Sequence, residues 1–79
     1  MSSRQVSDAT HPVRLRRRER RLTQAELAQA VGVSRQTVIA VERGDYAPSV
    51  YLALRIAKVL GATVEDLFAE ADESQEAGR

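Results

Sequence analysis

The stretch from Thr23 to Gly44, TQAELAQAVGVSRQTVIAVERG, constrains the fold of this chain more than any other stretch. Thr23 is a typical helix N-cap, and Glu26 three residues later completes a capping box. Gly32 is typical of the residue that ends a helix in a left-handed backbone conformation. Ser34 follows as a second N-cap, and Gly44 ends the second helix. Two helices this short, joined by a turn this tight, are typical of a helix-turn-helix.

Five apolar residues recur at helical spacing within these two segments: Leu27, Ala28, Val31, Val38 and Val41. If the second helix turns its valines inward, a rotation of about 100° per residue points Gln36, Ala40 and Arg43 away from the core. A short helix with a polar start and one free face fits the major groove of DNA. The motif therefore predicts nucleic-acid binding.

The distribution of charge favours the same interpretation. The net charge of the chain is only +1. Residues 1–43 hold nine arginines and four acidic residues, a net charge of +5, whereas residues 44–79 hold three basic and seven acidic residues, a net charge of −4. A charged run is often just a solvated face, but beside a helix-turn-helix the basic half is better explained by contact with phosphate groups.

The composition excludes several other classes of protein. The chain has 79 residues and no cysteine, which predicts one small domain without disulfides or a thiolate metal site. The single histidine, His11, has no cluster of possible ligands around it, so we expect no metal, no cofactor and no enzyme activity. No apolar run is long enough to cross a membrane and the N-terminus has no apolar signal core, which predicts a cytoplasmic protein, associated with the nucleoid when bound to DNA.

The motif resembles the DNA-binding domain of phage-repressor-type regulators, the Cro/repressor-like or XRE family. Six further segments agree with short single-domain members: Leu22 to Gln24, Glu42 to Gly44, Pro48-Ser49, Leu52-Ala53, Ile56-Ala57 and Glu65 to Phe68. The resemblance covers roughly residues 13–68. It implies an all-α, five-helix phage-repressor-like domain with the helix-turn-helix at its second and third helices.

Caps and apolar spacing predict three further helices, over about 13–20, 50–60 and 64–70. Pro12 is tolerated in the first turn of the first of these, and Ser49 and Thr63 cap the other two. The 50–60 helix has a broad apolar face: Val50, Leu52, Ala53, Ile56, Ala57 and Leu60. Residues 1–12 are then a flexible arm and residues 71–79 a disordered acidic tail, on either side of a DNA-binding domain at 13–70.

The 13–20 helix departs from the family at its basic face. A leucine is usual at the position of Arg16, and a glycine is usual at Arg21. Two alternatives follow for the first position: either Leu15 turns inward in its place, or the aliphatic stem of Arg16 packs while its head reaches water.

Arg35, Gln36 and Ala40 are the predicted base-reading residues, because in similar proteins these three positions contact bases. An arginine can donate two hydrogen bonds to guanine O6 and N7, and a glutamine matches adenine N6 and N7. Ala40 can at most touch a thymine methyl group. The alternative for Arg35 is an ion pair with a phosphate.

Four residues are predicted phosphate contacts: Gln24, Thr37, Arg43 and Arg18. A glutamine at the position of Gln24 clamps the DNA backbone in similar proteins, and the start of its helix attracts phosphate. Arg43 has an alternative role at the helix C-terminus. Arg14 and Arg21 are further candidates, each as easily explained as plain surface.

Arg17 and Glu42 are predicted to form a structural, semi-buried ion pair that joins the first and third helices, again because similar proteins have one. Such a pair fixes geometry more than it stabilises, since desolvation offsets much of the attraction.

The predicted function is sequence-specific binding of double-stranded DNA by a small transcriptional regulator, a repressor, with the third helix in the major groove. We expect a homodimer on a pseudo-palindrome, formed through Val64, Leu67 and Phe68 with the outer side of the 50–60 helix. For Phe68 the alternative is the core. No small-molecule ligand is implied. The alternative function is an antitoxin-type or other protein-interaction module that uses the same domain for autoregulation.

Overall fold

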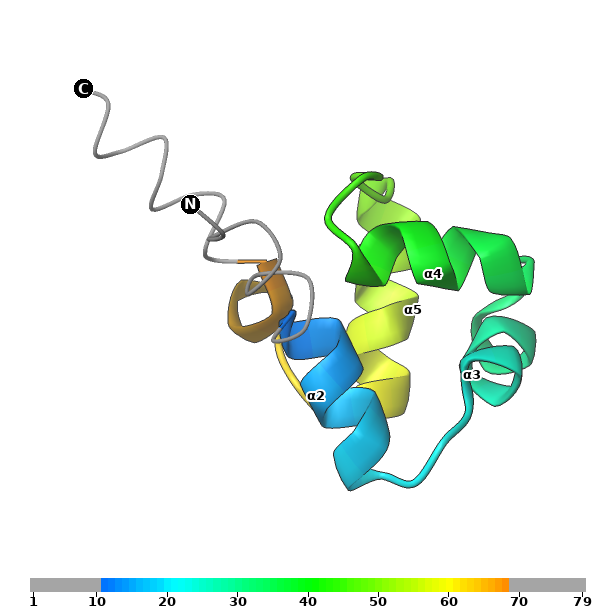
Figure 1. Ribbon diagram of the computed structural model, residues 1–79. Helices are drawn as coiled ribbons and strands as arrows, with labels where there is room; N and C mark the ends of the chain where they lie inside the picture. Colours follow the sequence, from blue (N-terminus) through cyan, green and yellow to red (C-terminus); the bar gives the residue numbers. More distant parts are fainter. Residues whose placement is uncertain (1–10, 69–79) are drawn as a thin grey trace, which may run out of the picture.

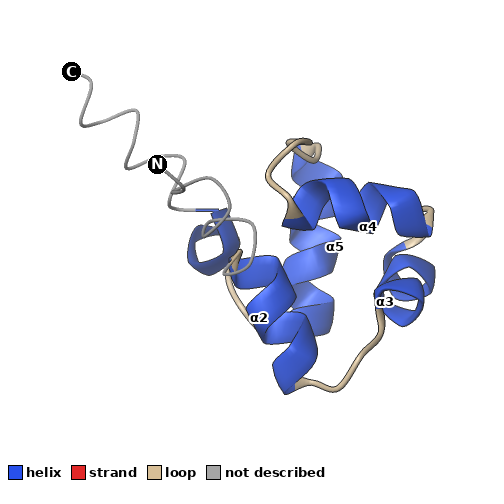
Figure 2. Cartoon of the chain, viewed as in Figure 1, coloured by secondary structure: helices blue, strands red, loops and turns tan. Residues whose placement is uncertain are grey.

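The structure, a computed structural model, describes residues 11–68. Four helices have both ends within this range: α2 (Pro12–Glu19), α3 (Gln24–Val31), α4 (Arg35–Glu42) and α5 (Val50–Leu60). Residues 64–68 are also helical, and the rest of the predicted 64–70 helix lies outside the described residues. Residues 11–68 contain helices and no strand, so the predicted all-α fold with a helix-turn-helix is confirmed (Figures 1 and 2).

The helices begin where the predicted caps place them. Thr23 Oγ1 accepts a hydrogen bond from the Glu26 N–H at 3.0 Å, and Glu26 Oε1 accepts one from the Thr23 N–H at 2.9 Å, which is a complete capping box. Ser34 and Ser49 each accept a hydrogen bond from the backbone N–H three residues later. At the start of α2, His11 Nδ1 accepts one from the Val13 N–H at 3.1 Å.

The core lies between α5 and the other helices. α5 packs against α2 and α3, and α4 packs against α2 and α3 (Figure 1). Eleven buried side chains form one cluster: Val13, Leu27, Ala28, Val31, Val38, Val41, Leu52, Ile56, Ala57, Leu60 and Leu67. This packing holds α3 and α4 together, and the faces of these two helices that point away from the core are not covered by another helix within residues 11–68.

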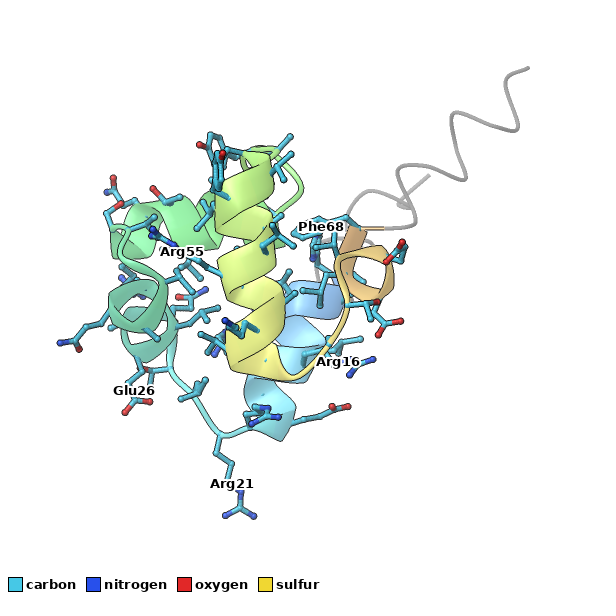
Figure 3. All side chains as sticks on the ribbon, turned by 180° about the vertical axis from the view of Figure 1, so that it is seen from behind. Arg16, Arg21, Glu26, Arg55 and Phe68 are labelled. Atoms are coloured by element: carbon cyan, nitrogen blue, oxygen red, sulfur yellow. The ribbon has the colours of Figure 1, made fainter. Side chains whose placement is uncertain are left out.

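The alternative in which Leu15 turns inward is wrong. Leu15 is 46% exposed, whereas Arg16 is half-buried and its Nη2 lies 3.6 Å from Asp66 Oδ2. Asp66 also accepts a hydrogen bond from the Thr63 N–H at 3.2 Å, so it caps the 64–68 segment and ties it to α2. Figure 3 shows Arg16 directed toward this segment.

Two predicted roles of apolar residues are corrected by the packing. Leu67 is fully buried in the core, because the 64–68 segment docks with this side chain inward, and it is therefore not available to a dimer interface. Val64 and Phe68 are only partly buried against the core. Val50, predicted on the apolar face of α5, is 72% exposed because the first turn of α5 is not covered by another helix.

Candidate nucleic-acid interface

The turn between α3 and α4 fixes how the two helices meet. Gly32 has a φ of +80°, a left-handed conformation that strains any residue with a side chain. Its N–H donates to the Ala28 carbonyl at 2.8 Å, which satisfies the end of α3, and α4 begins three residues later. The turn therefore sets the start of α4 directly after the end of α3, at the edge of the domain (Figure 1).

Arg17 and Glu42 form a buried ion pair between α2 and α4. Arg17 Nε donates to Glu42 Oε2 at 2.6 Å and Nη2 donates to Oε1 at 3.2 Å, a bidentate arrangement. Arg17 Nη1 donates to the Leu22 carbonyl at 2.8 Å, which also holds the loop before α3. Arg17 is 8% exposed and Glu42 2%, so these charges satisfy one another inside the domain and are not available to a ligand.

Gln24, the first residue of α3, extends this ion pair to the surface. Its Nε2 donates to Glu42 Oε1 at 3.2 Å, and its Oε1 accepts from Arg35 Nη2 at 3.3 Å. The buried carboxylate can only accept hydrogen bonds, so it turns the amide nitrogen inward and leaves the amide oxygen for Arg35. Arg35 and Glu42 are seven residues apart on α4, which is two turns and the same face of the helix.

A cleft lined by arginines opens between α2 and the start of α3. It has a volume of about 520 Å³ and is lined by Arg14, Arg17, Arg18, Arg21, Leu22, Thr23, Gln24, Ala25 and Arg35. We call it the basic cleft. Arg17 is neutralised by Glu42, but within the described part of the chain no acidic residue pairs with the other four arginines. The unpaired charge and the positive N-terminus of α3 together favour an anion such as a phosphate group.

Arg21, at the edge of this cleft, has a strained backbone conformation. Its φ is +59°, and it is the one residue other than glycine with a positive φ among residues 11–68. A left-handed conformation costs a residue with a side chain about 1 kcal/mol or more. Figure 3 shows the side chain extended away from the domain, where it contacts solvent. The glycine that is usual at this position would avoid the strain but would carry no charge.

The outer face of α4 is formed by the residues that helical geometry predicted to point away from the core. Gln36 and Arg43 are exposed and Ala40 is half-buried. Thr37 is half-buried, and its Oγ1 lies 3.0 Å from Ser34 Oγ. Arg43 Nε lies 3.4 Å from Asp45 Oδ2, an exposed pair that a phosphate could displace. The structure thus brings Gln24, Arg18 and Arg35 together in the basic cleft and leaves Gln36 and Ala40 on the adjoining face.

Two other arginines hold helix ends and are not part of this surface. Arg20 Nε donates to the Leu60 carbonyl at the end of α5 at 3.1 Å, and Arg55 Nη1 donates to the Val31 carbonyl at the end of α3 at 3.2 Å. Both complete a helix C-terminus from a different helix. The basic charge of the N-terminal half alone does not separate Arg20 from its cleft-lining neighbours, and spacing alone did not reveal that Gln24 contacts both Glu42 and Arg35.

Two further features of residues 11–68 bear on function. No three His, Asp or Glu side chains come together there in a way that could hold a metal ion. No helix in the same range is long and apolar enough to cross a membrane.

A capped pair of short helices, with an exposed start on the second and a basic cleft at the start of the first, defines a helix-turn-helix domain. The helix-turn-helix family matches residues 13–67, well over half of the chain, and the chain belongs to this family in its XRE-type form. The resemblance inferred from the sequence is therefore confirmed.

Several curated relatives share this domain. An uncharacterized HTH-type transcriptional regulator of Methanothermobacter thermautotrophicus is 56% identical over 57 residues, which cover 71% of this chain and 83% of the relative. One from Methanocaldococcus jannaschii is 54% identical over 52 residues, 66% of this chain and 79% of the relative. One from Bacillus subtilis is 52% identical over 46 residues, 58% and 70% respectively. The family is one of DNA-binding transcriptional regulators and is not a class of enzymes.

Proposed function

We propose that this protein binds specific sequences of double-stranded DNA and acts as a small transcriptional repressor. The observation that carries the proposal is the position of α4. Its exposed first residues, Arg35 and Gln36, adjoin a cleft in which the charges of Arg14, Arg18 and Arg21 are not neutralised. A helix that enters the major groove at its N-terminal end needs base-reading side chains there and cations beside them for the flanking phosphates.

In this mode α4 lies in the major groove, with Arg35, Gln36 and Ala40 toward the base edges. Gln24 and Arg18 contact the phosphates beside α3, and Thr37 and Arg43 contact those beside α4. The domain that does this spans residues 13–70. Repression follows from occupancy of a promoter, which needs no cofactor, no bound small molecule and no catalysis. We infer a cytoplasmic protein, associated with the nucleoid when bound.

A symmetric homodimer belongs to the same proposal. One recognition helix reads only a few base pairs, too few to select a site within a genome. Two copies on half-sites about 10 bp apart would read a pseudo-palindrome.

Selection of bound sites from random duplexes tests the function directly, because it reports binding, motif and symmetry together. We expect an enriched pseudo-palindromic motif. The same selection with Arg35→Ala tests the predicted base-reading residue. Lys58→Ala is its matched control, because it removes one positive charge from the last turn of α5, away from the basic cleft. Failure to enrich any sequence would contradict the proposal.

A further inference from the structure

Thr23 lines the basic cleft at the residue before α3 begins. It is exposed, and its Oγ1 accepts a hydrogen bond from the Glu26 N–H at 3.0 Å. Capping uses a lone pair of this oxygen and does not use its proton. Capping also needs no arginines nearby, since Thr63 caps the 64–68 segment in the same way outside the basic cleft. The surroundings of Thr23 therefore ask for an explanation beyond the cap.

Four arginines of the basic cleft carry charges that the domain does not neutralise: Arg14, Arg18, Arg21 and Arg35. Within residues 11–68 no acidic side chain forms an ion pair with any of them. A neutral hydroxyl makes no use of this charge. A phosphoryl group on the same oxygen would carry a charge of about −2 at pH 7 and three strong acceptor oxygens. Arginine clusters hold phosphorylated side chains through charge-assisted hydrogen bonds.

The residues that precede Thr23 suit an enzyme that adds such a group. Arg20 and Arg21 lie three and two positions before the threonine, and no other serine or threonine of the chain follows two basic residues this closely. Protein kinases select substrates partly by charge pattern, and an acidic substrate groove favours basic residues before the acceptor. Residues 18–21 are exposed, although Arg20 also donates to the Leu60 carbonyl, so the folded domain presents this pattern to solvent. Figure 3 shows Arg21 directed away from the domain.

We propose that Thr23 is a phosphorylation site and that its phosphoryl group closes the basic cleft to DNA. The γ-phosphoryl group of ATP is transferred: a bond forms between Thr23 Oγ1 and phosphorus, and the bond from phosphorus to the β-phosphate oxygen breaks. ADP leaves, and the hydroxyl proton passes to the base of the kinase. The new group then contacts the arginines and takes the place of a DNA phosphate. In this last step the inference rests on the proposed function.

Glu26 opposes the phosphoryl group, because its Oε1 accepts a hydrogen bond from the Thr23 N–H at 2.9 Å. Two negative groups at one cap repel each other, so we expect the Glu26 half of the capping box to open. Thr63 provides the matched control for this cost. It is also exposed, and Asp66 accepts a hydrogen bond from its N–H at 3.2 Å. Its acidic partner is paired with a single arginine, Arg16, and the site lies outside the basic cleft.

Chemical synthesis of the 79-residue chain with phosphothreonine at position 23 or at position 63 tests the site in the full chain. Phosphorus NMR against pH measures the second pKa of the phosphoryl group, which is about 6 without partners. We expect the pKa at position 23 to be about 1 lower than at position 63, because the arginines favour the dianion. Equal pKa values would overturn the inference. So would a chain phosphorylated at position 23 that circular dichroism shows to be unfolded.

Binding to the selected DNA site separates this inference from the proposed function. We expect phosphothreonine at position 23 to weaken binding about 100-fold and to reduce the slope of log affinity against log salt by about 2, since two positive charges are already neutralised. Phosphothreonine at position 63 should change the affinity less than about two-fold. Unchanged affinity with phosphothreonine at position 23 would overturn the inference. An unmodified chain that selects no DNA would refute the proposed function, while the pKa comparison would still test whether the cleft holds the phosphoryl group.

The acceptor itself is tested with the unmodified chain, ATP and a purified Ser/Thr kinase that selects basic residues. We expect mass spectrometry of the peptides to find the phosphoryl group on Thr23, and Thr23→Val to abolish the modification. Arg21→Ala should slow it about 10-fold, because one of the two preceding charges is lost. Lys58→Ala, which removes a charge from α5, is the control and should leave the rate unchanged. A phosphoryl group on Ser34 or Thr37 in place of Thr23 would overturn the assignment.

Discussion

The basic cleft and a second hollow, which we call the apolar groove, are of similar size and both adjoin α4, yet arginines dominate the lining of one and apolar side chains the lining of the other. The apolar groove has a volume of about 600 Å³ and lies between the end of α4, the 44–48 loop, the start of α5 and the 64–68 segment. Five arginines line the cleft, whereas the groove contains neither arginine nor lysine. In the cleft, position is set by directional hydrogen bonds that run from the buried Arg17–Glu42 pair through Gln24 to Arg35. In the groove, the lining is mostly apolar, so shape and exposed apolar area set what it can accept.

The difference shows how a small domain separates two tasks. Hydrogen bonds have a direction and can orient a side chain that must match the edge of a base. Apolar contact has no direction and suits the proposed contact between two copies of the chain. α4 connects the two, because Arg35 lines the cleft and Val41 lines the groove. Changes at the cleft should therefore alter which DNA is bound, and changes at the groove, which includes the predicted interface residues Val64 and Phe68, should alter dimerisation.

The largest expected effect comes from the anchor of the cleft. Glu42→Ala leaves the Arg17 guanidinium buried at 8% exposure without its partner, which should lower the free energy of unfolding by about 3–5 kcal/mol. A domain of this size has about 5–15 kcal/mol in total, so the change approaches unfolding. Urea unfolding measures it.

A double variant controls for this effect. Arg17→Met with Glu42→Leu removes both charges and keeps most of the volume, so it should be clearly more stable than Glu42→Ala. Strictly additive losses for the two positions would show that the ion pair does not join α2 to α4 energetically.

Arg35→Ala should produce the next largest effect, on specificity. If Arg35 reads a base, its loss relaxes the selected motif at one base pair per half-site and reduces discrimination there by about 1–3 kcal/mol. Site selection with the variant measures this, beside Lys58→Ala as the charge control. A uniform loss of affinity with an unchanged motif would mean that Arg35 contacts a phosphate instead.

Local patterns were enough to predict most of the fold. Thr23, Ser34 and Ser49 act as caps through bonds to residues three positions away, and such contacts depend on sequence neighbours alone. The Arg17–Glu42 contact was anticipated only through the family resemblance. The roles of Val50 and Leu67 were predicted wrongly, because both are apolar and at helical spacing, and their burial depends on which distant segment covers each end of α5.

Gln24 and the arginines of the cleft other than Arg17 were likewise predicted as DNA contacts, but the hydrogen bonds that join Gln24 to its neighbours were not. Gln24 was expected to contact only phosphate. Its bonds to Glu42 and Arg35 join residues 18 and 11 positions apart in the chain, and spacing along the sequence does not reveal contacts over such distances. The outer side of the 50–60 helix was predicted to be an apolar interface, but the 44–48 loop was not predicted to lie beside it. Tyr46 and Leu54 belong to a loop and a helix whose relative placement is set by tertiary packing, and exposure follows from that placement.

Gln24 provides a sharper test of the hydrogen-bonded chain. Gln24→Ala should weaken binding to every sequence, because a phosphate contact is lost, and should also reduce discrimination at the base pair read by Arg35. In a double-mutant cycle with Arg35→Ala, measured on the preferred and the altered site, we expect a coupling of about 0.5–1 kcal/mol. Gln29→Ala, at an exposed position later in α3, is the control. Zero coupling would mean that Gln24 does not orient Arg35.

The smallest expected effect, at Arg21, tests whether the cleft needs its outermost charge. Arg21→Gly removes the strain of a residue with a side chain at a φ of +59° but adds the freedom of glycine to the unfolded chain, a net gain in stability of about 0.5 kcal/mol. The same change removes one cation from the cleft, so the slope of log affinity against log salt should fall by about 1. Arg21→Lys keeps both the strain and the charge and should leave both quantities unchanged. The change is thus expected to raise stability and to lower DNA affinity. A variant that is more stable but binds every DNA sequence less tightly would show that the strained arginine serves phosphate contact. A variant with an unchanged salt slope would remove Arg21 from the interface and confine the cleft to Arg14, Arg18 and Arg35.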